Sequence, residues 1–349
     1  MYTGSLNIGS DKAVSNVVFD TGSGWLTVAT QLCEACSGGG KYDFHKSTTS
    51  KILDDGPENL YYGSATLTGK YISDDVCLGS DCIKGFEIFG ITKETGLQGV
   101  DGILGLSPDM YGNGPSFFDA LDKGGLTNGN HYFGYFIGDE TQTSEIDFGT
   151  VDASKIKKLD NIGDDEGFLT YDLAGYSWWQ LSLKGGDVGK TSFATASTTI
   201  VDSGTSLIAI TQSDWATYAK ALTASNPEFT CDPNQGLCYK QSACSGTSPD
   251  LSFSFDGEYY FVVPGATVEL EQDQQGQKFC INGVQGGIPD SQDMYILGDI
   301  FLRNFYAKYD MGNYQVGLAL DAYSKGTIVK RDPPHYEKRD PPHSIFLSQ

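Results

Sequence analysis

The chain has 349 residues, which is long enough for two domains with complete hydrophobic cores. Its 45 acidic residues outnumber 23 Lys and Arg, and the net charge of −22 argues against nucleic acid as a partner, because phosphate binding needs a basic face. No apolar run approaches the roughly 20 residues that cross a bilayer, so we expect no membrane span.

Short Val, Ile, Tyr and Phe runs, broken by many of the 44 glycines, predict a mostly β protein with tight turns. The first expected strand lies in "YTGSLNIGS", residues 2–10, directly after Met1. A signal peptide and a propeptide are therefore expected to lie outside this chain. The best helical signals are Ser116–Lys123 and Gln212–Leu222, both polar on one side as surface helices are.

A buried-strand pattern ends in an acid at Asp20. Residues 17–19, Val-Val-Phe, lead into Asp-Thr-Gly-Ser-Gly, although burying an unpaired charge costs several kcal/mol. One such element is most simply explained as an ordinary turn. A second copy, "TIVDSGTSL" at residues 199–207, places Asp202 after another apolar pair. Two copies, one in each half, are hard to explain as turns and indicate a functional pair.

The eight cysteines form an even set whose simplest pairing is sequential, one of the 105 connectivities that eight cysteines allow. Cys33 and Cys36 also suit a zinc site, but that site needs a second close pair or two histidines, and only His45 is near. We therefore expect disulfides, no metal and a location outside the cytosol. The expected pairs are Cys33–Cys36, Cys77–Cys82, Cys231–Cys238 and Cys244–Cys280.

The two halves repeat the same coarse order, so we expect an N-terminal β lobe over residues 1–160 and a C-terminal β lobe over 161–325. After its acid, each half has an Ile-Leu-Gly step, at residues 103–105 and 296–298. Residues 326–349 contain "KRDPPH" twice and predict a disordered Pro-rich tail. A processing site or a docking tag is the alternative function of this tail.

If the halves bring Asp20 and Asp202 together, the two carboxylates cannot both be ionised and share one proton over a wide acidic range. The charged member can then take a proton from water while the neutral member donates to a carbonyl oxygen, which hydrolyses an amide without metal, cofactor or covalent intermediate. A Ser or Cys nucleophile would need a histidine base. Outside the tail the chain has only His45 and His131, and neither lies in such a context.

The residues beside each acid fit this chemistry. Gly22 and Gly204 let backbone N–H groups approach the carboxylates closely. Ser23 and Thr205 place hydroxyl donors beside the outer carboxylate oxygens. These four residues are therefore expected to support the pair of acids.

The motifs "FDTGSG", "VDSGTS", "DGILGLS" and "YILGDIFLRNFYAKYDMGNYQVGLA" together resemble the pepsin-like aspartic endopeptidases, over residues 2–321. The resemblance implies a mostly β, bilobal pepsin-like acid protease fold with a central substrate cleft. It implies acid-active hydrolysis of peptide or protein substrates, a preference for bulky hydrophobic residues flanking the cut, and no cofactor. The two Ile-Leu-Gly segments would thread through the loops that carry the acids.

The family also has a β-hairpin flap with a tyrosine near its tip, and "LYYGSATLTGKY" occupies the matching place. Tyr62, followed by Gly63 and Ser64, aligns best, and Tyr61 is the alternative one residue earlier. On a strand these two tyrosines point to opposite faces, so only one can cover the cleft. By the same resemblance, Ser206 joins the implied substrate-binding residues.

The walls of the cleft also follow from the resemblance. It places Val100 and Ile103, with the flap tyrosine, in the apolar pocket on the amino side of the cut. Trp178 or Trp179 would line the far side. Each of these wall residues suits the core equally well, and the core is the favoured place for Trp179. The Cys244–Cys280 pair matches the family's C-lobe disulfide, and the Cys33–Cys36 pair is similar to a shortened form of its N-lobe loop.

The chain departs from the family at one functional position. The tryptophan that usually follows the first acid motif and supports the flap tyrosine is replaced by Thr27. Trp25 lies two residues earlier and, by strand parity, on the same face, so it is a candidate substitute.

Two alternatives predict a different function or assembly. A catalytically silent relative would bind peptides or proteins in the same cleft, but such proteins typically lose an acid or its glycine, and both are kept here. A retroviral-type homodimer needs one acid motif per chain, whereas this chain has two. We expect a monomer that is secreted or resides in a lysosome or vacuole.

Overall fold

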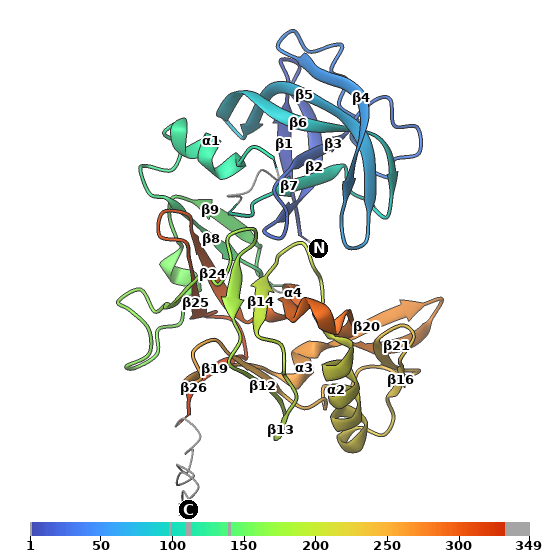
Figure 1. The fold of residues 1–349 in the computed structure, drawn as a ribbon, viewed down its shortest axis with the longest axis vertical. Coiled ribbons are helices and arrows are strands. Elements are labelled where there is room, and N and C mark those ends of the chain that lie inside the picture. The colour runs from blue at the N-terminus through green and yellow to red at the C-terminus, as the bar shows by residue number, and fades with distance from the viewer. Residues whose placement is uncertain (1, 98, 109–113, 139–140, 332–349) are drawn as a thin grey trace, which may run out of the picture.

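The computed structural model describes residues 2–331 except 98, 109–113 and 139–140. Strands dominate these residues. Figure 1 shows the blue N-terminal strands at one end of the molecule and the yellow and orange strands at the other, with green and red strands between them. The predicted mostly β, bilobal architecture is confirmed.

A seven-stranded sheet builds the N-terminal lobe, in the order β1-β2-β7-β3-β6-β5-β4. Its central strands are apolar because both faces are covered, as in the fully buried β3 and β7. The strands are β1 (Thr3–Ile8), β2 (Ala13–Asp20), β3 (Leu26–Ala29), β4 (Lys51–Tyr61), β5 (Thr66–Leu78), β6 (Asp81–Thr95) and β7 (Gly102–Gly105).

A five-stranded sheet between the lobes takes strands from both halves of the chain, in the order β10-β25-β24-β8-β9. Its strands are β8 (Tyr132–Phe136), β9 (Glu145–Phe148), β10 (Leu169–Asp172), β24 (Phe305–Asp310) and β25 (Gln315–Leu320). β24 pairs antiparallel with β8, so segments far apart in the sequence are hydrogen-bonded neighbours. The predicted lobe boundary at residue 160 lies between β9 and β10, two strands of this shared sheet.

Three smaller sheets build the C-terminal lobe. The first holds β11 (Gln180–Ser182), β14 (Thr198–Val201), β15 (Ile208–Thr211), β22 (Val284–Ile288) and β23 (Met294–Leu297). The second holds β12 (Gly185–Val188), β13 (Thr191–Ser192), β18 (Leu251–Ser254), β19 (Tyr259–Val263) and β26 (Thr327–Lys330). The third holds β16 (Thr230–Asp232), β17 (Leu237–Lys240), β20 (Glu269–Gln274) and β21 (Gln277–Asn282).

Both predicted helices form. α1 (Phe117–Lys123) begins after Ser116, whose side chain accepts a hydrogen bond from the backbone N–H of Asp119. α2 (Gln212–Ser225) runs three residues beyond its predicted end. The remaining helices are single turns: α3 (Gly265–Val268), α4 (Asp299–Leu302) and the 3₁₀ helices Ala153–Lys155 and Asp290–Gln292. None of the helices in the described ranges is long and apolar enough to cross a membrane.

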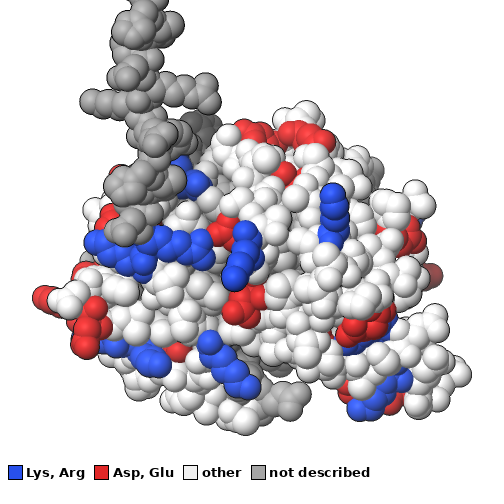
Figure 2. Space-filling view, turned by 90° about the horizontal axis from the view of Figure 1, so that it is seen from below, with Lys and Arg blue, Asp and Glu red and all other residues white. Residues whose placement is uncertain are grey.

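The prediction of a disordered tail is wrong for its first residues. Thr327–Lys330 forms β26 at the edge of a C-terminal sheet, with Ile328 buried opposite Phe261. Lys330 and Arg331, the first two residues of the first repeat, are ion-paired: Lys330 Nζ lies 2.5 Å from Glu258 and Arg331 Nη1 lies 2.5 Å from Asp187. On the face shown in Figure 2, Lys and Arg are interspersed with Asp and Glu. Residues 332–349, which hold most of both repeats, lie outside the described residues.

All four predicted disulfides are confirmed. Two of them join residues that face each other on paired strands, Cys77 with Cys82 and Cys231 with Cys238. The Cys244–Cys280 bridge closes the longest loop, with 36 residues of separation, so it restricts the unfolded chain most.

Candidate active site

The two predicted acids follow equivalent strands in the two lobes. β2 ends at Asp20 and runs parallel to β7, with Asp20 opposite Gly105. β14 ends at Val201, directly before Asp202, and runs parallel to β23. Each acid therefore continues an apolar strand held beside a parallel neighbour, which fixes where its carboxylate lies.

Glycine allows each Ile-Leu-Gly segment to lie against the loop that follows an acid. A Cβ at Gly105 would fall 2.6 Å from the carbonyl oxygen of Ser23, and one at Gly298 would fall 2.1 Å from that of Thr205. No side chain fits in either space. The predicted threading of these segments is therefore confirmed in both lobes.

Each carboxylate accepts one hydrogen bond from the backbone N–H two residues later and one from the hydroxyl three residues later. The four bonds are Gly22 N to Asp20 Oδ1 (2.8 Å), Ser23 Oγ to Asp20 Oδ2 (2.5 Å), Gly204 N to Asp202 Oδ1 (2.7 Å) and Thr205 Oγ1 to Asp202 Oδ2 (2.6 Å). The inner and outer oxygens are thus held in the same way in the two lobes, as the repeated motif predicts.

Thr21 and Ser203 join the two loops across the lobe interface. The sequence predicted no role for either residue. Ser203 N donates to Thr21 Oγ1 over 2.9 Å, and Thr21 N donates to Ser203 Oγ over 3.1 Å. Each hydroxyl also donates to a carbonyl of the opposite lobe, Thr21 to Val201 and Ser203 to Phe19. The signal was present in the sequence, because both motifs carry a hydroxyl residue directly after the acid.

The carboxyl groups of Asp20 and Asp202 face each other in a buried position, with exposed fractions of 6% and 7%. Burial is the main cause that raises the pKa of Asp20 well above its usual range, and the charge of Asp202 raises it further. A hydrogen bond between the two carboxyl groups acts in the same direction, while the bonds from Ser23 and Gly22 oppose it. The site therefore favours one proton on the pair.

A cavity of about 1030 Å³ opens over the two acids and takes its lining from both lobes. Tyr62, Gly63, Ser64, Ile103 and Ser206 all lie on it, as predicted from the resemblance. Among the described residues that line it, Asp20 and Asp202 are the only charged ones, and most others are apolar.

The segment predicted to form the flap is the hairpin of β4 and β5, closed by a turn in which Tyr62 N donates to Ala65 O over 2.8 Å. Tyr61 is 77% exposed, whereas Tyr62 is half-buried, so the structure favours Tyr62 as the tyrosine that faces inward. Burial raises the pKa of Tyr62 most, followed by the charge of Asp20, while hydrogen bonds with the hydroxyls of Ser23 and Thr27 lower it. The Tyr62 hydroxyl therefore lies beside the Asp20 loop.

Val100 is not on the cavity, and Trp179 belongs to the core, the place that the sequence favoured for it. Val100 is buried in the same apolar cluster as Ile103 and is not among the described residues that line the cavity. Trp179 is fully buried and its Nε1 donates to Leu106 O over 2.8 Å, which ties the C-terminal lobe to the N-terminal one. Trp178 is 38% exposed and lines the cavity, so the far-side position belongs to it.

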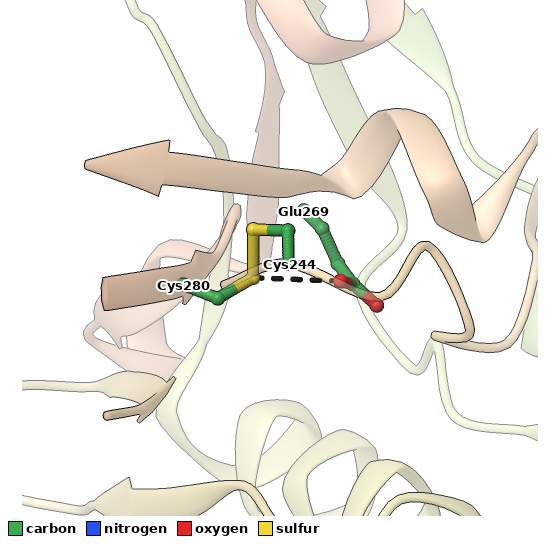
Figure 3. Close-up of side chains that lie close together, drawn as sticks. All are labelled: Cys244, Glu269 and Cys280. Carbon is green, nitrogen blue, oxygen red and sulfur yellow. Dashed lines mark hydrogen bonds between the residues drawn. A yellow bond between two sulfur atoms is a disulfide. The ribbon is translucent and has the colours of Figure 1, made fainter. Parts of the chain in front are cut away.

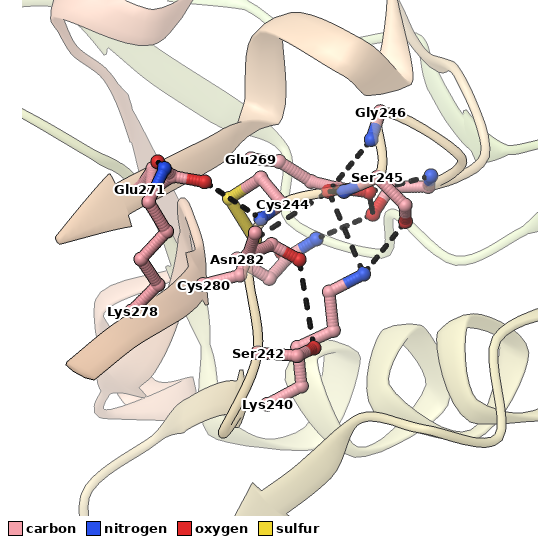
Figure 4. Close-up of a disulfide and its surroundings, with 12 residues drawn as sticks. Lys240, Ser242, Cys244, Ser245, Gly246, Glu269, Glu271, Lys278, Cys280 and Asn282 are labelled. Atoms are coloured by element: carbon pink, nitrogen blue, oxygen red, sulfur yellow. Dashed lines mark hydrogen bonds and ion pairs between the residues drawn. A yellow bond between two sulfur atoms is a disulfide. The ribbon is translucent and has the colours of Figure 1, made fainter. Parts of the chain in front are cut away.

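One group of metal-ligand side chains lies outside the cavity, at Cys244, Glu269 and Cys280 (Figure 3). Their ligand atoms lie within 4.8 Å of one another, but the two sulfurs are bonded to each other as a disulfide. The Glu269 carboxylate accepts hydrogen bonds from all four backbone N–H groups of residues 245–248 and from the Ser248 hydroxyl (Figure 4). The group is therefore a structural anchor for this loop.

Glu269→Gln is expected to lower the free energy of unfolding by about 3 kcal/mol at neutral pH, because an amide nitrogen would face N–H donors and the buried Lys240 would lose a charge partner. Burial is the largest effect on the pKa of Glu269 and raises it, but the hydrogen bonds from Gly246 and Ser248 more than compensate, so the pKa lies below its usual value. The charged form therefore stabilises the fold above the unfolded pKa, and this contribution is lost as pH falls through the folded pKa.

Denaturant titrations at neutral and acid pH measure the free energy of unfolding of wild type and Glu269→Gln. The difference in this free energy between the two proteins should be smaller in acid. The matched control is Glu271→Gln on the same strand, where the carboxylate is exposed, pairs with Lys278 at the surface and accepts a single backbone hydrogen bond, from Cys244 N, which the amide oxygen of Gln can also accept. Equal losses in the two variants would contradict the anchoring role.

Comparison with known proteins agrees with this geometry. The family model "Eukaryotic aspartyl protease" matches residues 1–321. The chain is 30% identical to pepsin A of Canis lupus familiaris over 331 residues, covering 91% of this chain and 80% of the relative. It is 31% identical to cathepsin E of Rattus norvegicus, covering 91% and 79%, and 28% identical to cathepsin D of Dictyostelium discoideum, covering 91% and 82%. The chain therefore belongs to the eukaryotic aspartyl protease family and is a pepsin-like aspartic-type endopeptidase.

Proposed function

We propose that this endopeptidase hydrolyses peptide bonds at acid pH through a water molecule activated by Asp20 and Asp202. The observation that carries the proposal is the pair of buried carboxyl groups, each held by its own loop and each facing the other under one cavity. A pair that shares one proton contains both a base and an acid at the same place.

The reaction then needs no further group. The ionised carboxylate takes a proton from water as the water oxygen attacks the carbonyl carbon, and the protonated carboxyl donates to the carbonyl oxygen. A tetrahedral diol results. In its breakdown the protonated carboxyl donates to the departing amine nitrogen, the C–N bond breaks, and the other carboxylate takes the proton of a diol hydroxyl, which restores the singly protonated pair.

The surroundings of the pair support these roles. Gly22, Ser23, Gly204 and Thr205 hold the two carboxyl groups in position for proton exchange by fixing both oxygens of each. Tyr62, with Gly63 and Ser64, would close over the substrate. The apolar lining around Ile103 and Trp178 supports a preference for bulky hydrophobic residues on either side of the cut.

The alternative, a silent relative that binds peptides in the same cleft, is less well supported. It would not require the shared proton, the two hydroxyl contacts or the Thr21–Ser203 link, all of which serve to fix the carboxyl groups. The four disulfides support our placement of the enzyme outside the cytosol, secreted or in a lysosome or vacuole. Because one chain supplies both acids, we also propose that it acts as a monomer.

The pH profile tests the proposal. Cleavage of an unfolded protein, measured from about pH 2 to 8 with and without a statine-type inhibitor, is expected to give a bell-shaped curve with its maximum in acid. The alkaline limb falls as pH rises through the raised pKa of Asp20, because the general acid loses its proton. Folded protein that is inactive throughout, or activity that increases toward pH 8 and ignores the inhibitor, would refute the proposed mechanism.

A further inference from the structure

Residues 33–40 form a loop of the N-terminal lobe that we call the outer loop. None of its residues, all of which the structure describes, lines the cavity. The two cysteines of its disulfide, Cys33 and Cys36, are nevertheless buried in the apolar cluster that contains Leu97 and Ile103. Because Leu97 and Ile103 both line the cavity, the outer loop packs against the cavity wall from the outside.

Ser37 joins the outer loop to residues 94–101, which we call the wall segment. Its hydroxyl donates to Leu97 O over 2.6 Å and accepts from Gly99 N over 3.0 Å. Its backbone N–H donates to the Glu94 carboxylate over 2.8 Å. One serine therefore fixes the wall segment at its start and on both sides of its middle.

The absence of a side chain at Gly38 allows the two segments to touch. A Cβ there would fall 2.6 Å from Val100 O and closer still to Asp101 Oδ1. The same Asp101 oxygen accepts a hydrogen bond from Gly40 N over 2.7 Å. Gly39 is exposed, and no heavy atom lies within 4 Å of the place of an added Cβ. The close contact is therefore specific to Gly38, where no side chain fits.

The wall segment lies between the outer loop and the cavity. Gly96 and Leu97 belong to the wall segment and line the cavity. Leu97 shares its apolar cluster with Ile103, which the resemblance places in the pocket on the amino side of the cut. A gap of roughly 0.5–1 Å already removes a quarter to a half of the dispersion attraction at a contact. The position of the wall segment should therefore decide how well this pocket fits a large apolar side chain.

We propose that Ser37 and Gly38 are positioning residues that set the selectivity for the substrate residue on the amino side of the cut. They act on the wall segment from outside and touch neither the substrate nor the two acids. This inference rests on the proposed function for its catalytic meaning, but the binding preference that it describes does not require hydrolysis.

Two variants change the position of the wall segment in different ways. Gly38→Ala adds a methyl group at the contact with Val100 O, so it must push the two segments apart. Ser37→Ala removes the hydroxyl that bonds to Leu97 O and Gly99 N. Both should reduce the fit of the pocket, and the effect of Ser37→Ala should be smaller because Ser37 is exposed and water can replace part of its bonds.

The measurement is kcat/KM for peptides that differ only in the residue on the amino side of the cut. The ratio of the value for Phe to the value for Ala should fall about tenfold in Gly38→Ala and about threefold in Ser37→Ala, as a misfit in an apolar pocket does. The same ratio for the residue on the carboxyl side should stay at its wild-type value. A general loss of stability would lower both ratios or neither.

Gly39→Ala is the matched control, because it adds the same methyl group to the neighbouring residue, where nothing meets it. It should keep the wild-type ratios. An amino-side ratio that is unchanged in Ser37→Ala and in folded Gly38→Ala would overturn the proposal, and so would an equal fall in both ratios. If Gly38→Ala does not fold, Ser37→Ala alone decides.

Binding separates this inference from the proposed function. The probe is a peptide in which a CH₂ group replaces the carbonyl of the cut bond, made with Phe or with Ala on the amino side. Calorimetry should show that wild type prefers Phe and that the two variants lose this preference by the same factors. That result in a chain that cleaves no peptide would uphold the inference and remove the proposed function. Cleavage by wild type with an unchanged binding preference in both variants would do the reverse.

Discussion

We expect Asp202→Asn to lower kcat by at least about 10⁴-fold at every pH. The reaction needs one carboxyl group as the base and the other as the acid, and asparagine can serve as neither. Asparagine has nearly the same shape, and its oxygen can still accept the bond from Gly204 N. Thr205 can rotate its hydroxyl to accept from the new amide. The loss should therefore be chemical and not structural, as steady-state kinetics on one peptide substrate would measure.

The same variant should be more stable than wild type near neutral pH. The raised pKa of Asp20 means that the folded state binds a proton more tightly than the unfolded chain does. Stability linked to Asp20 is therefore present below the unfolded pKa and is lost as pH rises through the folded pKa. Removing the Asp202 charge relieves the part of this destabilisation that comes from that charge, while the larger part from burial remains, so thermal unfolding near pH 7 should shift upward.

Asp172→Asn is the matched control, because it makes the same change on an exposed β10 residue outside the cavity lining. It should leave kcat and the unfolding temperature close to wild type. Measurable hydrolysis by Asp202→Asn, still sensitive to a statine-type inhibitor, would count against a shared-proton mechanism.

Gly204→Ala is expected to reduce kcat by more than about 100-fold, although it adds a single methyl group. A Cβ at this position would fall 2.1 Å from Asp20 Oδ1, in the other lobe, so one carboxyl group must move. The equivalent change Gly22→Ala meets Asp202 Oδ1 at 2.5 Å and should have a similar effect. Moving either carboxyl group away from the added methyl group breaks the contact between the two carboxyl groups, on which the proposed reaction depends.

Gly39→Ala provides the control for the glycine variants, because no heavy atom lies within 4 Å of the place that its added methyl group would take. It should keep wild-type kinetics. The pH profile of Gly204→Ala adds a second check, since separated carboxyl groups should titrate more nearly independently and the alkaline limb should move to lower pH. Wild-type kcat in Gly204→Ala would show that the two loops can separate without loss of function.

The acid motifs could be predicted from the sequence because the chemistry of each is contained in about five consecutive residues. The position of Asp20 at the end of a buried strand and its contacts with Gly22 and Ser23 are local consequences of that motif. The disulfides followed equally well, because each joins cysteines that are neighbours in order along the chain.

Features that depend on contacts with residues far away in the sequence were not predicted. Thr21 and Ser203 have no visible role until their loops meet, because each bonds to the other and to a strand of the opposite lobe. Val100 was placed on the cavity by the resemblance, but a buried side chain of the cluster that contains Ile103 has the same apolar character whether or not it reaches the cavity. β26 was missed because its stability comes from pairing with β19 and not from its own composition.

The sheet shared by the two halves has a consequence for synthesis on the ribosome. β8 emerges early, but β24, the strand that pairs with one of its edges, is made only after most of the C-terminal lobe, through β23, has been translated. Until then that edge has unpaired backbone groups and is a site for aggregation or for chaperone binding. The nascent chain therefore keeps this open edge until residues 305–310 have been made, and a chain released before them would be expected to aggregate or to be held by a chaperone.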